Sequence, residues 1–197
     1  MMISKRPIYG LVPLIAVLGA CGEASNNADD VTPQPAATFA GLAAEAARLD
    51  VLTQSLPRVQ ADNIPDMGTV SYDGVVTMNT DTGPDLIGDL TLEAAFMTSG
   101  ISGGMTNIIN EDDEAYTGSL NITGDIVRTG DTNIDALLSG TINNETGELT
   151  TVLTTMRGEF RGLGTEAVSG TVEGNIIGGD YGSSGAAVDG TFDAERQ

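Results

Sequence analysis

From Met67 to the end of the chain at Gln197, apolar residues alternate with polar ones. Clusters rich in glycine or asparagine interrupt this alternation about every ten positions. A period of two places every second side chain on the same face of an extended strand. Short alternating segments at regular spacing, divided by turn residues, are typical of antiparallel sandwiches and barrels. No other feature of the sequence constrains the fold as strongly.

The alternation predicts about eight strands. They are expected at Val70–Met78, Leu86–Phe96, Ile101–Ile109, Tyr116–Val127, Ile134–Ile142, Leu149–Phe160, Val168–Ile177 and Val188–Ala194. Asn143–Gly147 has the composition of a hairpin turn between two of them. Eight strands suffice to close a barrel that side chains fill, and closure removes the exposed strand edges. We therefore expect an all-β domain over 67–197, with antiparallel strands forming a small up-and-down barrel.

The segment before these strands has a helical composition. Its apolar residues at helical spacing are Leu42, Ala46, Leu49 and Leu52 or Thr53. Alanine and other good helix formers fill the positions between them, and Pro57 ends the run. Residues 39–57 are therefore predicted to form one short amphipathic helix. It is expected to pack inside or outside the barrel as a plug or lid, or alternatively to bind a partner.

The chain begins with a segment typical of exported proteins. Lys5 and Arg6 give a positively charged start, and residues 8–18 are mostly apolar. This apolar run is too short to cross a membrane as a helix, which takes ~20 residues. It ends in Leu18-Gly-Ala-Cys21, which resembles the lipobox of bacterial lipoproteins. Residues 1–20 are therefore predicted to be a lipoprotein signal peptide.

Cys21 is the only cysteine of the chain. The resemblance implies that it is acylated, becomes the first residue of the mature protein and binds membrane lipid; the alternative is an ordinary buried cysteine. Gly22 follows it rather than aspartate, which by analogy favours the outer membrane, with the domain either surface-exposed or facing the periplasm. Residues 21–38 are polar and contain two prolines, so they are predicted to be a disordered tether.

Composition limits the classes of function. The chain has 8 lysines and arginines, 28 acidic residues and no histidine, for a formal net charge of -20. Removing the predicted leader leaves 6 basic and 28 acidic residues. This net negative charge repels the phosphate backbone of nucleic acids, so we expect no nucleic-acid partner. Without histidine the chain lacks a Ser-His-Asp triad, a His-ligated zinc site and a His-ligated haem, and we expect no enzyme activity, cofactor or metal.

The end of the chain contains a repeat. Ala167–Val172 recurs as Ala187–Phe192, and each copy follows an aromatic residue and a cluster of glycines. The aromatic residue is expected to end one strand, and the glycines to allow a tight reversal. Gly170 and Gly190, inside the returning strands, indicate a bulge or a close approach of two backbones.

These closing segments resemble the last hairpins of the β-barrel domain of transferrin-binding protein B. The matching elements are Gly158-x-Phe-x-Gly, Ala186-x-x-x-Gly-x-Phe and the terminal Glu195-Arg, and residues 90–109 are similar to an earlier hairpin. The resemblance implies a barrel that factor-H-binding and haemophore-like surface lipoproteins share. Relatives that grip transferrin carry a handle domain before the barrel, for which residues 22–66 are too short. Transferrin binding is therefore not expected.

Three short motifs have a chemical and a plain structural interpretation. Asp81-Thr-Gly83 matches the aspartic-protease triplet, but it follows a polar residue and is expected to be a turn. Residues 131–135 begin like a calcium loop, yet Ala136 and Ile142 replace its required glycine and glutamate. The acidic run 111–114 could hold a hard cation weakly, although a solvated hairpin loop is favoured.

Three hypotheses for function remain. The first is a lipid-anchored, non-enzymatic barrel that binds an extracellular protein or a small molecule through loops such as Asn110–Ala115 and Gly178–Ala186. The second is a structural or protective envelope lipoprotein without a discrete ligand. The third is an integral outer-membrane barrel, which needs an apolar outer band with aromatic girdles, whereas aromatic residues make up 4% of the chain.

Overall fold

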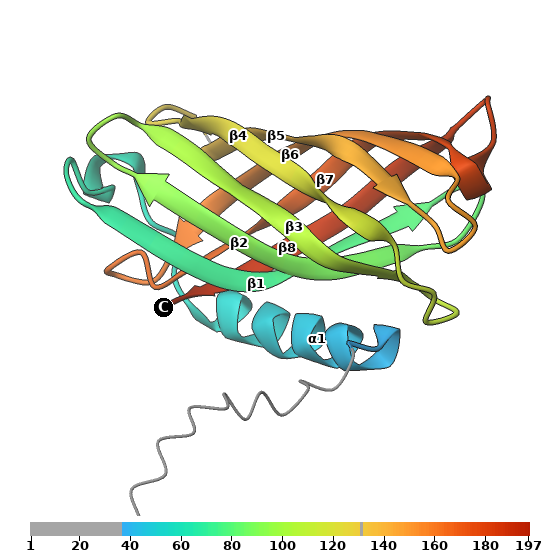
Figure 1. Ribbon diagram of the computed structural model, residues 1–197. Helices are drawn as coiled ribbons and strands as arrows, with labels where there is room; N and C mark the ends of the chain where they lie inside the picture. The colour runs from blue at the N-terminus through green and yellow to red at the C-terminus, as the bar shows by residue number, and fades with distance from the viewer. Residues whose placement is uncertain (1–36, 131) are drawn as a thin grey trace, which may run out of the picture. The chain divides into compact units, whose positions relative to one another are not determined.

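The structure is a computed structural model that describes residues 37–130 and 132–197. Eight antiparallel strands follow one another around a closed barrel, in which β8 pairs back with β1 (Figure 1). They are β1 (Thr69–Thr80), β2 (Leu86–Ala95), β3 (Gly100–Asn110), β4 (Thr117–Ile126), β5 (Ile134–Asn143), β6 (Leu149–Arg161), β7 (Ala167–Gly178) and β8 (Ala186–Arg196). The predicted up-and-down barrel is confirmed. The predicted signal peptide, Cys21 and the tether up to residue 36 lie outside the described residues.

The alternation of residues fills the barrel with apolar side chains. Along β6, Val152, Met156 and Phe160 point inwards and are at most 1% exposed, while Thr151 and Arg157 face outwards. The main apolar cluster takes residues from all eight strands. Apolar side chains thus fill the interior, and polar side chains cover the outside. An integral membrane barrel requires the opposite arrangement.

The helix α1 (Phe39–Ser55) lies along the outside of the barrel, over β1, β2 and β8 (Figure 1). Its buried residues Leu42 and Leu49 pack in a second apolar cluster with outward-facing residues of the barrel. Those are Val75, Ile87 and Ile109. The predicted helix is thus confirmed, and its position outside the barrel is established.

Both ends of the helix follow from local chemistry. Thr38, predicted as the last residue of the tether, is instead an ordered cap whose Oγ1 accepts a hydrogen bond from the Gly41 amide at 3.1 Å. The helix ends at Ser55, two residues before the predicted end, because Leu56 precedes Pro57 and adopts an extended conformation.

The segment 56–68, here called the strap, closes the barrel end at which β1 begins (the strap end). The Val59 amide donates to the carbonyl of Phe160 at 2.9 Å, and the side chains of Val59 and Ile64 belong to the barrel core. Arg128 holds the strap from the other side, donating to the carbonyls of Ile64 at 3.0 Å and Pro65 at 2.6 Å. The strap end is therefore sealed by a chain segment from outside the barrel.

The predicted close approach at Gly170 is confirmed. Gly170 lies opposite Gly158 on β6, and a Cβ on either residue would lie within 2.6 Å of the Phe192 ring. The two missing side chains leave room for that ring inside the barrel. At Gly190, likewise, a Cβ would lie 1.9 Å from the carbonyl oxygen of Thr77.

The described residues from 37 onwards form one compact unit that contains both apolar clusters. The chain from Gly22 onwards therefore retains every contact described here. Among the described residues, no helix has the length and apolar character needed to cross a bilayer.

Candidate functional site

The end of the barrel opposite the strap, here called the rim end, is closed by two tyrosines. Tyr116 and Tyr181 are each 5% exposed and belong to the barrel core. Tyr116 donates to Asp180 Oδ2 at 2.5 Å, and Tyr181 donates to the carbonyl of Pro84 at 2.8 Å. Burial, and then the nearby Asp180, raise the pKa of Tyr116, and burial raises that of Tyr181 most, so both hydroxyls keep their protons. A ligand that meets this end contacts loops rather than an open cavity.

Four loops surround this end, here called the rim loops: residues 81–85, 111–116, 144–148 and 179–185. Two of them share one construction. The Asn110 carboxamide oxygen accepts from the amides of Asp112 at 3.0 Å and Glu114 at 2.9 Å. The Asn144 oxygen accepts in the same way from the amides of Thr146 at 3.1 Å and Glu148 at 2.9 Å. Each loop is therefore held by its own asparagine.

The loops predicted to bind a partner, Asn110–Ala115 and Gly178–Ala186, meet at this end. The hydrogen bond from Tyr116 to Asp180 joins them, and Asn144 Nδ2 also donates to Asp180 at 3.0 Å. Sequence reasoning missed these tyrosines and Asn144. The asparagine could have been found, because Asn-x-x-x-Glu occurs in both loops, at 110–114 and at 144–148.

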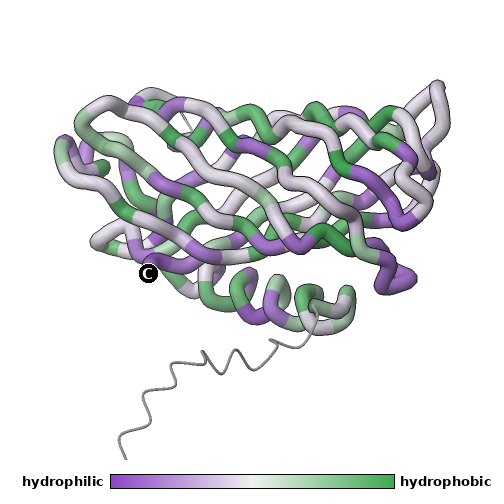
Figure 2. Tube along the Cα trace, viewed as in Figure 1, coloured by the Kyte–Doolittle hydropathy of each residue, from purple (hydrophilic) through white to green (hydrophobic). Residues whose placement is uncertain are grey.

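The rim loops carry nine acidic residues and no lysine or arginine. Figure 2 shows the loop between β3 and β4 as a continuous hydrophilic stretch. Some of these carboxylates hold the structure together: Asp113 Oδ1 accepts from the Phe39 amide of α1 at 2.6 Å, and Asp81 Oδ1 accepts from the Ala187 amide at 2.8 Å. A partner that approaches the rim end meets a negative field and an ordered backbone.

The short motifs have structural roles where they are described. Residues 81–83 form the turn between β1 and β2, as expected. Residues 111–114 form the hairpin loop between β3 and β4. In the described ranges, no group of three or more carboxylates is arranged to hold a metal ion. Asp131, the start of the rejected calcium loop, lies outside these ranges.

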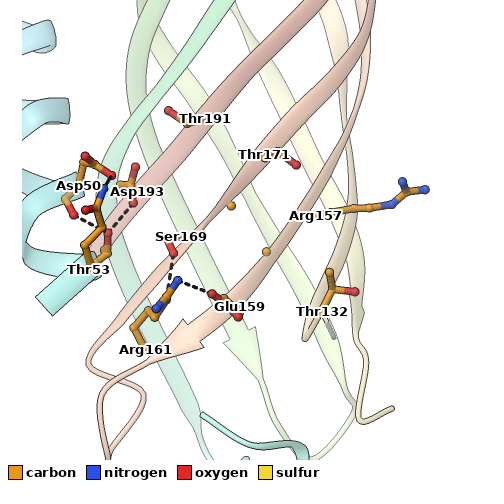
Figure 3. Close-up of a pocket in the computed structure, with 13 residues that line it drawn as sticks. Asp50, Thr53, Thr132, Arg157, Glu159, Arg161, Ser169, Thr171, Thr191 and Asp193 are labelled. Carbon is orange, nitrogen blue, oxygen red and sulfur yellow. Dashed lines mark hydrogen bonds and ion pairs between the residues drawn. The ribbon is translucent and has the colours of Figure 1, made fainter. Parts of the chain in front are cut away.

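A second candidate surface is a groove of about 520 Å³ between the last turns of α1 and strands β6, β7 and β8 (Figure 3). The backbone of Gly158 and Gly170 forms part of its lining, and a Cβ at either position would point into the barrel, toward the Phe192 ring. The hydroxyls of Ser169, Thr171 and Thr191 line it. The groove is therefore a shallow polar surface on the outside of the barrel.

One wall of this groove holds a buried carboxyl group. Asp193 is 7% exposed and accepts a hydrogen bond from Thr53 Oγ1 at 2.8 Å, which links β8 to α1. Burial raises the pKa of Asp193 to about 6, the repulsion of Asp50 adds to the rise, and Thr53 and Arg161 oppose it. Because its hydrogen-bonding partner is a helix residue, this carboxyl fastens α1 to the barrel.

The other charged residues that line the groove are Asp50, Arg157, Glu159 and Arg161. Glu159 forms ion pairs with Arg58, at 2.7 Å, and with Arg161, and Arg161 also donates to Ser169 at 3.3 Å. Arg157 extends away from the helix on the far side of the groove (Figure 3). The groove thus offers donors and acceptors to a polar ligand, and its buried carboxyl is engaged by the protein itself.

No protein-family model matches the chain, and no curated protein matches it. Among solved structures, the chain is similar to a mutant of the vaccine antigen transferrin-binding protein B from Haemophilus parasuis. That likeness has a TM-score of 0.44 and 15% sequence identity, and it covers 71% of this chain and 28% of the other. This chain therefore spans less than a third of the length of that protein.

Proposed function

We propose that this chain is a lipid-anchored lipoprotein of the bacterial outer membrane, and that its barrel binds a partner without catalysis through the rim loops. The anchoring rests on the sequence alone, on the apolar leader and the Leu-Gly-Ala-Cys21 motif. The binding role rests on the architecture of the barrel.

One observation carries the binding role. Side chains fill the barrel, Tyr116 and Tyr181 close its rim end, and each of two rim loops is ordered by its own asparagine. Loops held in one conformation lose little entropy when they bind, which favours recognition by surface contact over enclosure of a ligand. The nine carboxylates of these loops favour a partner that is neutral or cationic at the contact.

The anchoring is tested by labelling cells with radioactive palmitate and comparing the wild type with Cys21→Ser. Incorporation that depends on Cys21 supports the anchor, and equal labelling of both proteins contradicts it. Protease treatment of intact cells then reports the side of the membrane. Cleavage on whole cells supports surface display, whereas protection until the outer membrane is broken places the domain in the periplasm.

The binding role is tested by affinity capture on the chain from Gly22 onwards. The bait is compared with a variant in which Asn110→Ala and Asn144→Ala release both rim loops, and with Thr151→Ala on the outer face of β6 as a matched control. A partner captured by the wild type and the control but not by the loop variant supports the proposal. Capture that is equal for all three, or absent for all three, favours the structural or protective role.

A further inference from the structure

The groove between α1 and strands β6, β7 and β8 has opposite charges on its two sides (Figure 3). The strand register places its outward side chains in two neighbouring rows: Asp193, Ser169 and Glu159 in one, and Thr191, Thr171 and Arg157 in the other. With ~4.8 Å between strands and ~6.7 Å between rows, the Cα atoms of Asp193 and Arg157 lie roughly 12 Å apart at opposite corners. Hydroxyl groups lie between these two charges.

The side of the groove next to α1 holds two carboxylates. Asp193 Oδ1 accepts the hydrogen bond from Thr53, whereas no other described residue donates to its Oδ2. Asp50 on α1 lies close enough to Asp193 for their repulsion to raise the pKa of Asp193. Within the described ranges, neither carboxylate forms an ion pair. A buried carboxylate with an unused oxygen is costly when ionised, and a cationic donor offsets that cost.

The far side of the groove holds an arginine without a partner among the described residues. Arg157 is exposed, and none of them forms an ion pair or a hydrogen bond with its side chain. Asp135 lies opposite it on β5, yet the two do not form an ion pair. The second arginine that lines the groove, Arg161, is paired with Glu159. Arg157 is thus available to a carboxylate, to which a guanidinium group can donate two parallel hydrogen bonds.

These two sides fit a ligand with opposite charges at its two ends. An extended peptide of three residues spans about 10 Å from its α-amino group to its α-carboxylate. Its amide groups match the hydroxyls of Ser169 and Thr171, which both donate and accept hydrogen bonds. The volume of about 520 Å³ is in the range of small-molecule sites. A cationic ligand without an anionic group leaves Arg157 unpaired, and an anionic ligand without a cationic group is repelled by the carboxylates beside α1.

We propose that this groove binds a short zwitterionic peptide, with the peptide amine at Asp50 and Asp193 and the peptide carboxylate at Arg157. The Arg157 side chain extends away from the helix (Figure 3), so its χ angles rotate to bring the guanidinium group over the bound carboxylate. The peptide amine supplies the donor that Asp193 Oδ2 lacks. The site lies on the wall of the barrel, so it depends neither on the rim loops nor on the lipid anchor.

The test is a titration of the ¹⁵N-labelled chain from Gly22 onwards with triglycine at pH 7, followed by the NMR shifts of the backbone amides. Amides of residues 169–171 and 191–193 are expected to shift and to saturate with a Kd of about 1 mM, while those of the rim loops do not move. N-acetyl-triglycine lacks the charged amine, and triglycine amide lacks the carboxylate. Each of these two peptides is expected to bind at least about tenfold more weakly than triglycine.

Variants separate binding from stability. Asp193→Asn removes the costly charge, so the fold is retained, and it weakens triglycine binding at least about tenfold. Arg157→Gln, at an exposed position, weakens binding similarly. Asp189→Asn removes one charge from the same strand outside the groove, and it binds triglycine as the wild type does.

Three results overturn the proposal. The first is a wild type whose amide shifts do not saturate at about ten times the expected Kd. The second is equal binding of the three peptides. The third is an Asp193→Asn or Arg157→Gln variant that binds triglycine as tightly as the Asp189→Asn control.

Discussion

The two ends of the barrel are closed in different ways. At the strap end, Val59 and Ile64 enter the core, and Arg128 holds the segment that carries them. At the rim end, Tyr116 and Tyr181 close the core with side chains whose hydroxyls are bonded to the loops. Both ends bury side chains in the core, but at the strap end the hydrogen bonds run to backbone carbonyls from the Val59 amide and Arg128, whereas at the rim end the tyrosine hydroxyls donate to the rim loops.

Their charges differ as well. The rim loops contain nine acidic residues and no basic one, whereas Arg58, Arg128, Arg161 and Arg196 all lie at the strap end. There the arginines pair with Glu159 and Asp66 or donate to backbone carbonyls. Carboxylates that are not neutralised repel one another, which costs stability. The charges at the strap end are thus paired in a way that favours stability. The rim end keeps a negative electrostatic field that is available to a binding partner.

The largest effect is expected at the strap end. Ile64→Ala removes a side chain that is 4% exposed and leaves a cavity at the strap, so it lowers the free energy of unfolding by about 2–5 kcal/mol. Urea denaturation followed by circular dichroism measures the loss. Met67→Ala, at a residue 76% exposed on the same segment, changes stability by less than about 0.5 kcal/mol. Equal effects of the two substitutions would contradict the role of the strap as a plug.

The next effect is expected at the rim end. Tyr116→Phe removes the hydrogen bond to the Asp180 carboxylate, and its expected cost is about 1.5 kcal/mol. Since this bond joins two rim loops, hydrogen exchange of the amides in 111–116 and 179–185 accelerates, while that of the strap does not. Tyr72→Phe is the matched control, because it removes a bond to the carbonyl of Thr165 at the strap end. A Tyr116→Phe variant whose strap exchanges faster would show that the two ends are not independent.

Sequence predicted the barrel itself well, for a physical reason. In a closed meander each strand pairs with its neighbours in the chain, so alternation and turns determine most of the topology. Repeated glycines also indicated close packing, and at Gly170 a Cβ would meet both the backbone of β6 and the Phe192 ring. The helix was predicted from its own spacing: of the predicted residues, Leu42, Leu49 and Thr53 are buried, and Ala46 and Leu52 are partly buried.

The closures of the two ends could not be predicted in this way. The strap has no periodicity, and Val59 and Ile64 are isolated apolar residues among polar ones and prolines. Tyr116 and Asp180 are 64 positions apart, and neither has a local signal for the other. The packing of α1 on the outside of the barrel depends on Val75, Ile87 and Ile109. These strand residues face outwards, although apolar strand residues are expected to face the barrel interior.

The pH dependence of stability is expected to come from Asp193, the carboxyl group that joins β8 to α1 through Thr53. The pKa of Asp193 is about 6 in the folded protein, against 3.8 for an unperturbed carboxyl, so the folded state binds the proton more readily. Stability therefore rises as the pH falls from above 6 towards 4, and the charged form is a cost above pH 6. The gain is about 1–2 kcal/mol, since solvent in the groove screens part of the nominal effect at ~1.4 kcal/mol per pKa unit.

Two variants isolate this dependence. Asp193→Asn abolishes the rise and is more stable than wild type at pH 8. Thr53→Val removes the donor that stabilises the carboxylate, so it raises the pKa of Asp193 further and steepens the rise. Thermal unfolding between pH 4 and pH 8 measures both. A wild-type curve that is flat in this window, or unchanged in Asp193→Asn, would assign the dependence to other groups.

The smallest effect compares the charges of the two ends directly. Neutralising Glu111 and Asp112 as Glu111→Gln and Asp112→Asn relieves repulsion in a rim loop, so the melting temperature rises slightly at low salt. The matched change at the strap end is Asp66→Asn, which removes the ion pair between Asp66 and Arg128 at 3.3 Å and lowers the melting temperature slightly. In ~1 M salt, where the screening length falls to ~3 Å, both shifts vanish. Shifts of opposite sign at low salt are the signature of two ends with different electrostatics, and shifts of the same sign would show that net charge alone governs both.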